Sequence, residues 1–159
     1  MKLQRNLRGR SVSQTSNAMP KRVARVAAVQ FMYEMEMGDK KTPSDKDLEE
    51  FVETYVEERI NFSFFKKLID DLQKDADFAG IVNNVLEDGK TISNSPPVEI
   101  CIIKTALAEM IFEKTDIPVI INEYVEIAKD FLDQKAAKFI NALLDKISKT
   151  VERRCQTKA

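Results

Sequence analysis

The chain has 159 residues, of which 43% are hydrophobic and 32% charged, a balance typical of a globular domain with a core of its own. It contains no histidine, which excludes every catalytic triad, zinc site and proton shuttle that depends on imidazole. With only four glycines, it cannot form the glycine-rich loops that bind nucleotide phosphates. These absences exclude most common enzyme chemistries, and we expect no cofactor.

The net charge of -1 conceals an uneven distribution of charge along the chain. The first 33 residues carry seven basic side chains and no acid, which leaves 18 basic against 26 acidic side chains in the remainder. A basic N-terminal part on an acidic domain favours binding to a polyanion, because basic charge spread evenly among acids would largely cancel. For residues 1–19 the alternatives are a solvated, disordered extension and an organelle transit peptide.

The sequence also lacks the signatures of membrane proteins and of metal sites. No segment reaches the roughly 18 consecutive apolar residues of a membrane helix, and no signal-peptide core is present. We therefore expect a cytoplasmic protein without a membrane partner. Cys101 and Cys155 have no paired spacing and no neighbouring base, which predicts neither a disulfide nor a nucleophile and places Cys101 in the core. The many carboxylates are interpreted as solvated helix surface, and no metal is assigned.

From residue 20 onward, apolar residues recur at helical spacing, and proline and glycine fall between the periodic blocks. This pattern predicts an all-α fold in which seven helices pack as a compact bundle. Gly89 and the loop that follows it form the clearest interruption. They predict a domain over residues 20–154 with two small subdomains, about 20–90 and 91–154, and a tail at 155–159.

The first helix is expected to follow Pro20 directly. Its core stripe is predicted to consist of Ala24, Ala27, Ala28, Phe31 and Met35. The opposite face, with Arg22, Val29 and Tyr33 and with Arg25 beside them, is expected to be exposed.

The next three helices are predicted to be short and amphipathic. Ser44 and Asp47 have the spacing of a capping box, which marks the start of the second helix, and the apolar stripe of that helix extends to Tyr55 and Val56. Apolar blocks within residues 62–72 and 78–86 predict the third and fourth helices.

The last three helices are expected to supply most of the core. Residues 98–112 are apolar almost all round, which predicts a helix at the buried centre of the bundle. Asp116 and Pro118 open the sixth helix. The seventh is predicted to bury Ala136, Phe139, Ile140, Leu143, Leu144, Ile147 and Val151, while Lys138, Asn141 and Asp145 point away.

The start of the first helix carries the most informative chemistry in the chain. Lys21, Arg22 and Arg25 supply cations that bind phosphate, and a guanidinium group also stacks on bases. Gln30 and Tyr33 add a polar and an aromatic group to the surface that we expect to be exposed. This combination favours unpaired RNA as the ligand, and a solvated helix start is the alternative interpretation.

Several short motifs occur in an order that resembles the NusB family of transcription antitermination factors. They are Lys21-Arg22-x-Ala24-Arg25, Asp116-Ile117-Pro118, Ile121-Asn122-Glu123 and Lys138-Phe139-Ile140-Asn141, and the similarity extends over about residues 20 to 150. The resemblance implies an all-helical fold of two small subdomains and no catalysis.

The same resemblance implies a set of partners and contact residues. The partners are the boxA element of ribosomal RNA leaders, the ribosomal small-subunit protein NusE and the RNA polymerase antitermination complex. In the family the arginine-rich start of the first helix contacts RNA, which carries over to Lys21, Arg22 and Arg25 and more weakly to Gln30 and Tyr33. A second RNA patch carries over to Lys135 and Lys138, in a segment where this chain departs from the family pattern.

A second hypothesis comes from another class of protein. The chain would be a helical protein-interaction module that forms a homodimer or docks a partner without RNA. Its contact surface would be Val26, Val29 and Tyr33.

Overall fold

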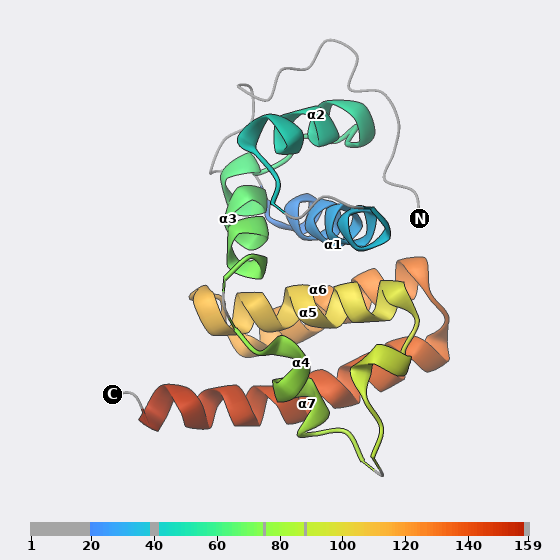
Figure 1. Cartoon of the computed structure of the whole chain (residues 1–159), viewed down its shortest axis with the longest axis vertical. Coiled ribbons are helices and arrows are strands. Elements are labelled where there is room, and N and C mark those ends of the chain that lie inside the picture. Colours follow the sequence, from blue (N-terminus) through green and yellow to red (C-terminus); the bar gives the residue numbers. More distant parts are fainter. Residues whose placement is uncertain (1–19, 39–41, 75, 88, 158–159) are drawn as a thin grey trace. The chain divides into compact units, whose positions relative to one another are not determined.

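The computed structural model describes residues 20–38, 42–74, 76–87 and 89–157 (Figure 1). Every regular element in these ranges is a helix, which confirms the all-α prediction. The chain divides into two compact units, which we call unit 1, ending at Gln73, and unit 2, beginning at Lys74. The interpretation of residues 1–19 as a basic extension lies outside the described residues. No helix within these ranges is long and apolar enough to cross a membrane.

Unit 1 is built around a cluster of aromatic rings. It contains α1 (Arg22–Met37), α2 (Asp45–Tyr55) and α3 (Phe62–Leu72), with α2 on one side of α1 and α3 crossing beside it (Figure 1). Phe65 of α3 is fully buried, and its ring centroid lies 6.0 Å from that of Phe31, 6.0 Å from that of Phe51 and 5.9 Å from that of Phe62. Each helix thus contributes a ring to one apolar centre.

The start of α2 confirms the predicted capping box. The backbone N–H of Ser44 donates to Oδ2 of Asp47 at 2.9 Å, and the backbone N–H of Asp47 donates to Oγ of Ser44 at 3.2 Å. The apolar stripe is buried at Leu48, Phe51 and Val52, but the prediction is wrong for Tyr55, which is 40% exposed. Because α2 ends at Tyr55, no further helical turn covers this ring.

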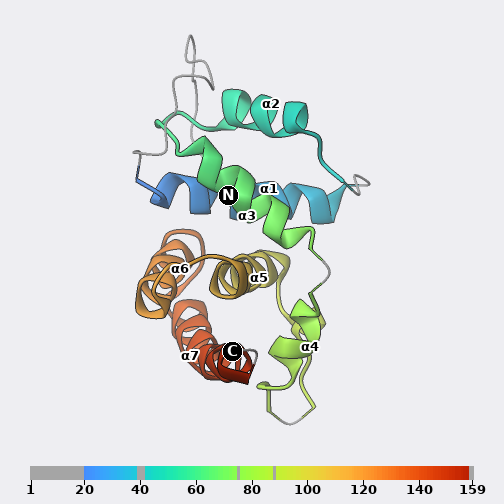
Figure 2. The same cartoon turned by 90° about the vertical axis from the view of Figure 1, so that its left-hand side faces the viewer.

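Unit 2 contains α4 (Phe78–Asn83), the short 3-10 helix η2 (Ile92–Asn94), α5 (Pro97–Phe112), α6 (Ile117–Phe131) and α7 (Gln134–Thr157). Helices α5, α6 and α7 pack side by side, as Figures 1 and 2 both show. Residues 101–103 and 105–110 of α5 are buried. This burial on several sides confirms the prediction from the apolar circumference of the helix.

Polar groups within α5 have hydrogen-bond partners. The hydroxyl group of Tyr124 in α6 donates to Oε1 of the buried Glu109 at 2.9 Å, and the hydroxyl group of Thr105 donates to the carbonyl oxygen of Cys101 at 2.7 Å. Cys101 is buried, as predicted for a small core residue. The bond between Glu109 and Tyr124 adds a directional link to the apolar packing of α5 on α6.

The boundary between the units lies after Gln73 and not near residue 90 as predicted. Helix α4 packs against η2, α5 and α7 in unit 2, and the backbone N–H of Ile92 donates to Oδ1 of Asn83 at 2.8 Å. Gly89, with φ of 69°, therefore belongs to a turn within unit 2. Helix α4 ends at Asn83, whereas the predicted fourth helix extended to residue 86. A helix of only six residues is stable only when it packs against longer helices, and α4 finds these in unit 2.

The buried face of α7 is rotated relative to the prediction. The buried side chains of α7 are Ala137, Ile140, Leu143, Leu144, Ile147, Ser148 and Val151. The prediction is wrong for Phe139, which is 38% exposed. Successive side chains in a helix are rotated by about 100° about the helix axis. Phe139 therefore lies at the edge of the buried stripe that contains Ile140, where its ring is partly exposed to solvent. Lys138, Asn141 and Asp145 are exposed, as predicted.

Candidate nucleic-acid interface

The N-terminal end of α1 concentrates positive charge. Lys21 is the N-cap residue and makes no side-chain cap, and the first turn of α1 contains no acidic residue. The backbone N–H groups at this end carry the positive partial charge of the helix dipole, to which Lys21, Arg22 and Arg25 add three full charges. An anion bound at this end would relieve the repulsion and satisfy the N–H groups.

Lys21 and Arg25, one helical turn apart, both lie over the ring of Phe64 in α3. The Nζ atom of Lys21 is 4.7 Å from the ring centroid, and the Cζ atom of Arg25 is 5.3 Å from it. Asn61 caps α3 by accepting the backbone N–H of Phe64 at 3.1 Å, and both residues are buried. The ring therefore holds two cations in place through cation–π contacts.

Phe64 was not among the site residues predicted from the sequence. This residue lies in a run of three phenylalanines, Phe62, Phe64 and Phe65, within five residues of each other. No local pattern distinguishes the ring that faces the cations of α1 from the rings that enter the aromatic cluster. Only the packing of α1 against α3 makes the distinction.

The exposed face predicted for α1 is partly wrong. Lys21 and Arg22 are exposed, but Arg25 is only 4% exposed, Gln30 only 7%, and Val29 is fully buried. Tyr33 is half-buried. Helix α1 is buried around most of its circumference between Ala24 and Met32, so it has no broad solvent face there. The docking surface expected at Val26, Val29 and Tyr33 is also interrupted, because Val29 at its centre is buried and cannot contact a partner.

The two lysines predicted as a second RNA patch lie at the start of α7 in unit 2. Lys135 and Lys138 are both exposed, and the backbone N–H of Ala136 donates to Oδ1 of Asp133 at 2.8 Å, which caps the helix. Lys135 and the exposed ring of Phe139 line a groove of about 800 Å³, whose other wall is the segment before α5 with Lys90, Thr91, Asn94 and Ser95. The structure thus places the exposed ring of Phe139 in the same groove as Lys135, which the sequence did not predict.

Glu99 of α5 lies in the wall of the same groove, which we call the α7 groove. Burial raises the pKa of its carboxyl group, and the neighbouring carboxylate of Asp133 raises the pKa further. The folded chain therefore holds this proton more tightly than the unfolded chain does. The stability that this proton contributes is present at low pH and is lost as the pH rises through the raised pKa.

Replacing Glu99 removes this pH dependence. We expect Glu99→Gln to match the unaltered chain in melting temperature near about pH 4 and to exceed it near about pH 7, where the native carboxylate is charged. Thermal unfolding followed by circular dichroism at both pH values measures the effect. Glu58→Gln, at an exposed position, is the control and should shift neither value. An equal gain at both pH values would show that packing, and not charge, is responsible.

Comparison with known proteins finds matches to a single family. The sequence model of the NusB family matches residues 22–149. The transcription antitermination protein NusB of Campylobacter hominis is 34% identical over 137 residues, covering 79% of this chain and 93% of that protein. The corresponding protein of Sinorhizobium fredii is 32% identical over 141 residues, covering 80% and 85%.

Comparison with solved structures also finds NusB proteins. The structure of T. maritima NusB superposes with a TM-score of 0.70 at 26% identity, covering 82% of this chain and 92% of that chain. A crystal structure of the antitermination factors NusB and NusE in complex with dsRNA gives a TM-score of 0.67 at 26% identity, covering 81% and 96%.

Proposed function

Because this chain belongs to the NusB family, we propose that it binds single-stranded RNA of the boxA type in ribosomal RNA leaders. It does so together with NusE, as a component of an RNA polymerase antitermination complex. The presence of NusE and RNA with NusB in one similar structure supports both partners. The same relatives are transcription antitermination proteins, which supports a role in binding and not in catalysis.

The observation that carries the proposal is the acid-free, basic start of α1, where the N-cap residue is itself a lysine. Arg22 is exposed, and Lys21 and Arg25 are held over Phe64. Lys21, which already lies over this ring, loses less side-chain freedom when it binds phosphate than a cation that moves freely in solvent. Because Arg25 is almost completely buried, it serves best as a fixed positive charge behind the exposed Lys21 and Arg22, which reach the phosphates.

The α7 groove suits the bases of the same ligand. Phe139 offers an exposed ring on which an unpaired base can stack, and Lys135 and Lys138 offer charges for the flanking phosphates. Half-buried Tyr33 remains a candidate for stacking in unit 1. The burial of Gln30 favours a supporting role for its amide over a direct contact with RNA.

Loss of the exposed cations of α1 tests the proposal directly. We expect Lys21→Ala with Arg22→Ala to weaken boxA RNA binding and to lower the slope of log affinity against log salt by about 0.7 for each lost phosphate contact. Fluorescence anisotropy with labelled RNA, repeated at several salt concentrations, measures both quantities. Both residues are exposed, and Lys21 loses a cation–π contact with Phe64 worth about 0.5–1 kcal/mol, so the melting temperature should fall only slightly.

The matched control is Lys67→Ala with Lys114→Ala, which removes two exposed lysines outside the proposed interface. An equal loss of affinity in this control would show that the net charge, and not the start of α1, binds RNA. A duplex of the same sequence serves as a second comparison, because one similar structure contains dsRNA. If the duplex binds as tightly as the single strand, the preference for unpaired RNA is wrong.

A further inference from the structure

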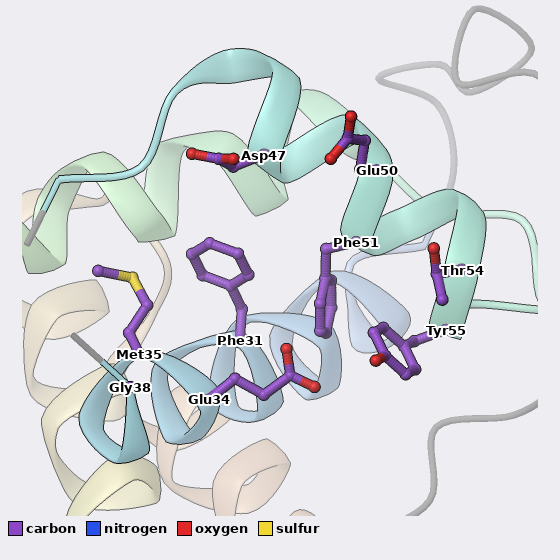
Figure 3. A pocket seen from close by; sticks show the side chains of 9 residues that line it. All are labelled: Phe31, Glu34, Met35, Gly38, Asp47, Glu50, Phe51, Thr54 and Tyr55. Atoms are coloured by element: carbon purple, nitrogen blue, oxygen red, sulfur yellow. The ribbon is translucent and has the colours of Figure 1, made fainter. Parts of the chain in front are cut away.

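A groove between α1 and α2 in unit 1 plays no part in the proposed RNA interface. It encloses about 420 Å³ and is lined by Phe31, Glu34, Met35, Gly38, Asp47, Glu50, Phe51, Thr54 and Tyr55. Figure 3 shows Phe31 pointing from α1 toward α2, Phe51 and Tyr55 pointing from α2 toward α1, and Glu34 extending along α1 toward the Tyr55 end of the groove. We call this surface the α1/α2 groove.

The floor of the α1/α2 groove is aromatic. The rings of Phe31 and Phe51 meet edge to face with centroids 5.2 Å apart, and the ring of Tyr55 lies 5.2 Å from that of Phe51. Phe31 and Phe51 are almost completely buried, whereas Tyr55 is exposed at the open end. A group that enters the groove therefore packs mainly on the exposed ring of Tyr55, with the nearly buried rings of Phe31 and Phe51 beside it.

The rim of the same groove is acidic. Glu34 comes from α1, Asp47 and Glu50 come from α2, and the lining residues that the structure describes include no basic side chain. Burial raises the pKa of Glu34, so a cation beside its carboxylate would offset the cost of that burial. Glu50 has one ionic neighbour, Lys46, at 3.9 Å, and both side chains are mostly exposed, so this pair is weak.

An aromatic floor below a rim of carboxylates suits arginine. Its guanidinium group stacks on a ring and donates paired hydrogen bonds to a carboxylate, while its methylene stem covers apolar surface. Charge complementarity thus identifies the occupant as a basic polypeptide segment with some apolar side chains.

The chain itself carries such a segment outside the described residues. Residues 1–19 contain Lys2, Arg5, Arg8 and Arg10 and no acid, with Leu3 and Leu7 among them. They lie just before α1, whose length from Arg22 to Met35 is about 20 Å at the usual rise per residue. Nineteen residues can span up to about 60 Å, so the segment is long enough to reach the groove of its own chain.

We propose that residues 1–19 bind the α1/α2 groove of their own chain, with arginine side chains between its aromatic floor and its carboxylate rim. This inference does not depend on the proposed function. Tethering favours the intramolecular complex because the linked segment is present at millimolar effective concentration.

Paramagnetic broadening in the full chain tests this contact. A nitroxide is attached at Ser11→Cys in a chain with Cys155→Ser, while the native Cys101 is buried. We expect the amide signals of Gly38 and Thr54, which line the groove, to lose intensity in the absence of RNA. About 1 M salt, which shortens the screening length to about 3 Å, should restore them. Unchanged intensities at low salt would overturn the proposal.

Charge removal on the rim provides the specific test. Glu34→Gln with Glu50→Gln should abolish the broadening, whereas Glu49→Gln with Glu53→Gln should retain it. The control pair removes the same charge from exposed positions of α2 that do not line the groove. Equal effects of both pairs would contradict binding in the groove. Broadening that requires a mixture with a second, spin-labelled chain would overturn the intramolecular arrangement and assign the groove to another copy.

Discussion

We expect Phe65→Ala to destabilise unit 1 by about 3–5 kcal/mol, the cost of removing a fully buried phenyl ring from a packed core. The ring contacts Phe31, Phe51 and Phe62, so its loss leaves a cavity that opens toward all three helices of the unit. Most domains have a total stability of only about 5–15 kcal/mol, so this is a large fraction of what holds unit 1 together.

Amide hydrogen exchange is the appropriate measurement, because it reports the opening of α1 and α3 separately from the helices of unit 2. Phe139→Ala is the matched control, since it deletes the same ring from an exposed position in unit 2. It should change protection in α3 very little. If α3 amides keep their native protection in Phe65→Ala, the aromatic cluster is not the stabilising core of unit 1.

A fourfold rise in salt concentration should weaken RNA binding about 60-fold. About four phosphate contacts on a single strand give a slope near -3 for log affinity against log salt. Lys21 and Arg22 in unit 1 and Lys135 and Lys138 in unit 2 are the exposed cations that we assign to these contacts. Anisotropy titrations at several salt concentrations measure the slope.

The variant Lys135→Ala with Lys138→Ala separates the contributions of the two units. Its slope should be lower in magnitude by about 1.4, because two contacts are lost. An unchanged slope would exclude these lysines from the RNA interface while leaving the α1 contacts intact. A flat salt dependence in the unaltered chain would instead contradict phosphate binding altogether. Circular dichroism at each salt concentration serves as the control for folding.

Features determined by neighbouring residues were predictable from the sequence. The capping box of Ser44 and Asp47 needs only a spacing of three residues, and both of its hydrogen bonds are present. The apolar circumference of α5 predicted its burial for a similar reason, because a helix without a polar face has no side to present to water. Local rules of this kind set where helices begin and which of them lie deep inside a unit.

Features that depend on contacts between helices were not predictable. Arg25 is buried because Phe64, on another helix, provides a surface for its guanidinium group, and helical periodicity contains no information about that ring. Phe139 was assigned to the core because it is large and apolar, yet a small rotation of the stripe gives its place to Ala137. The unit boundary was misplaced because a loop in the sequence shows only where a helix ends. It does not show that α4 packs against α5 and α7 of unit 2.

The order of helices along the chain has a consequence for synthesis of the protein. The apolar surface of α5 is covered largely by α6 and α7, which follow it in the sequence. The 45 residues from the end of α5 at Phe112 to the end of α7 at Thr157 take roughly 2–9 s to translate at about 5–20 residues per second. During that interval the apolar surface of α5 on the nascent chain is not yet covered, so the yield of folded protein depends on chaperone supply and on growth temperature.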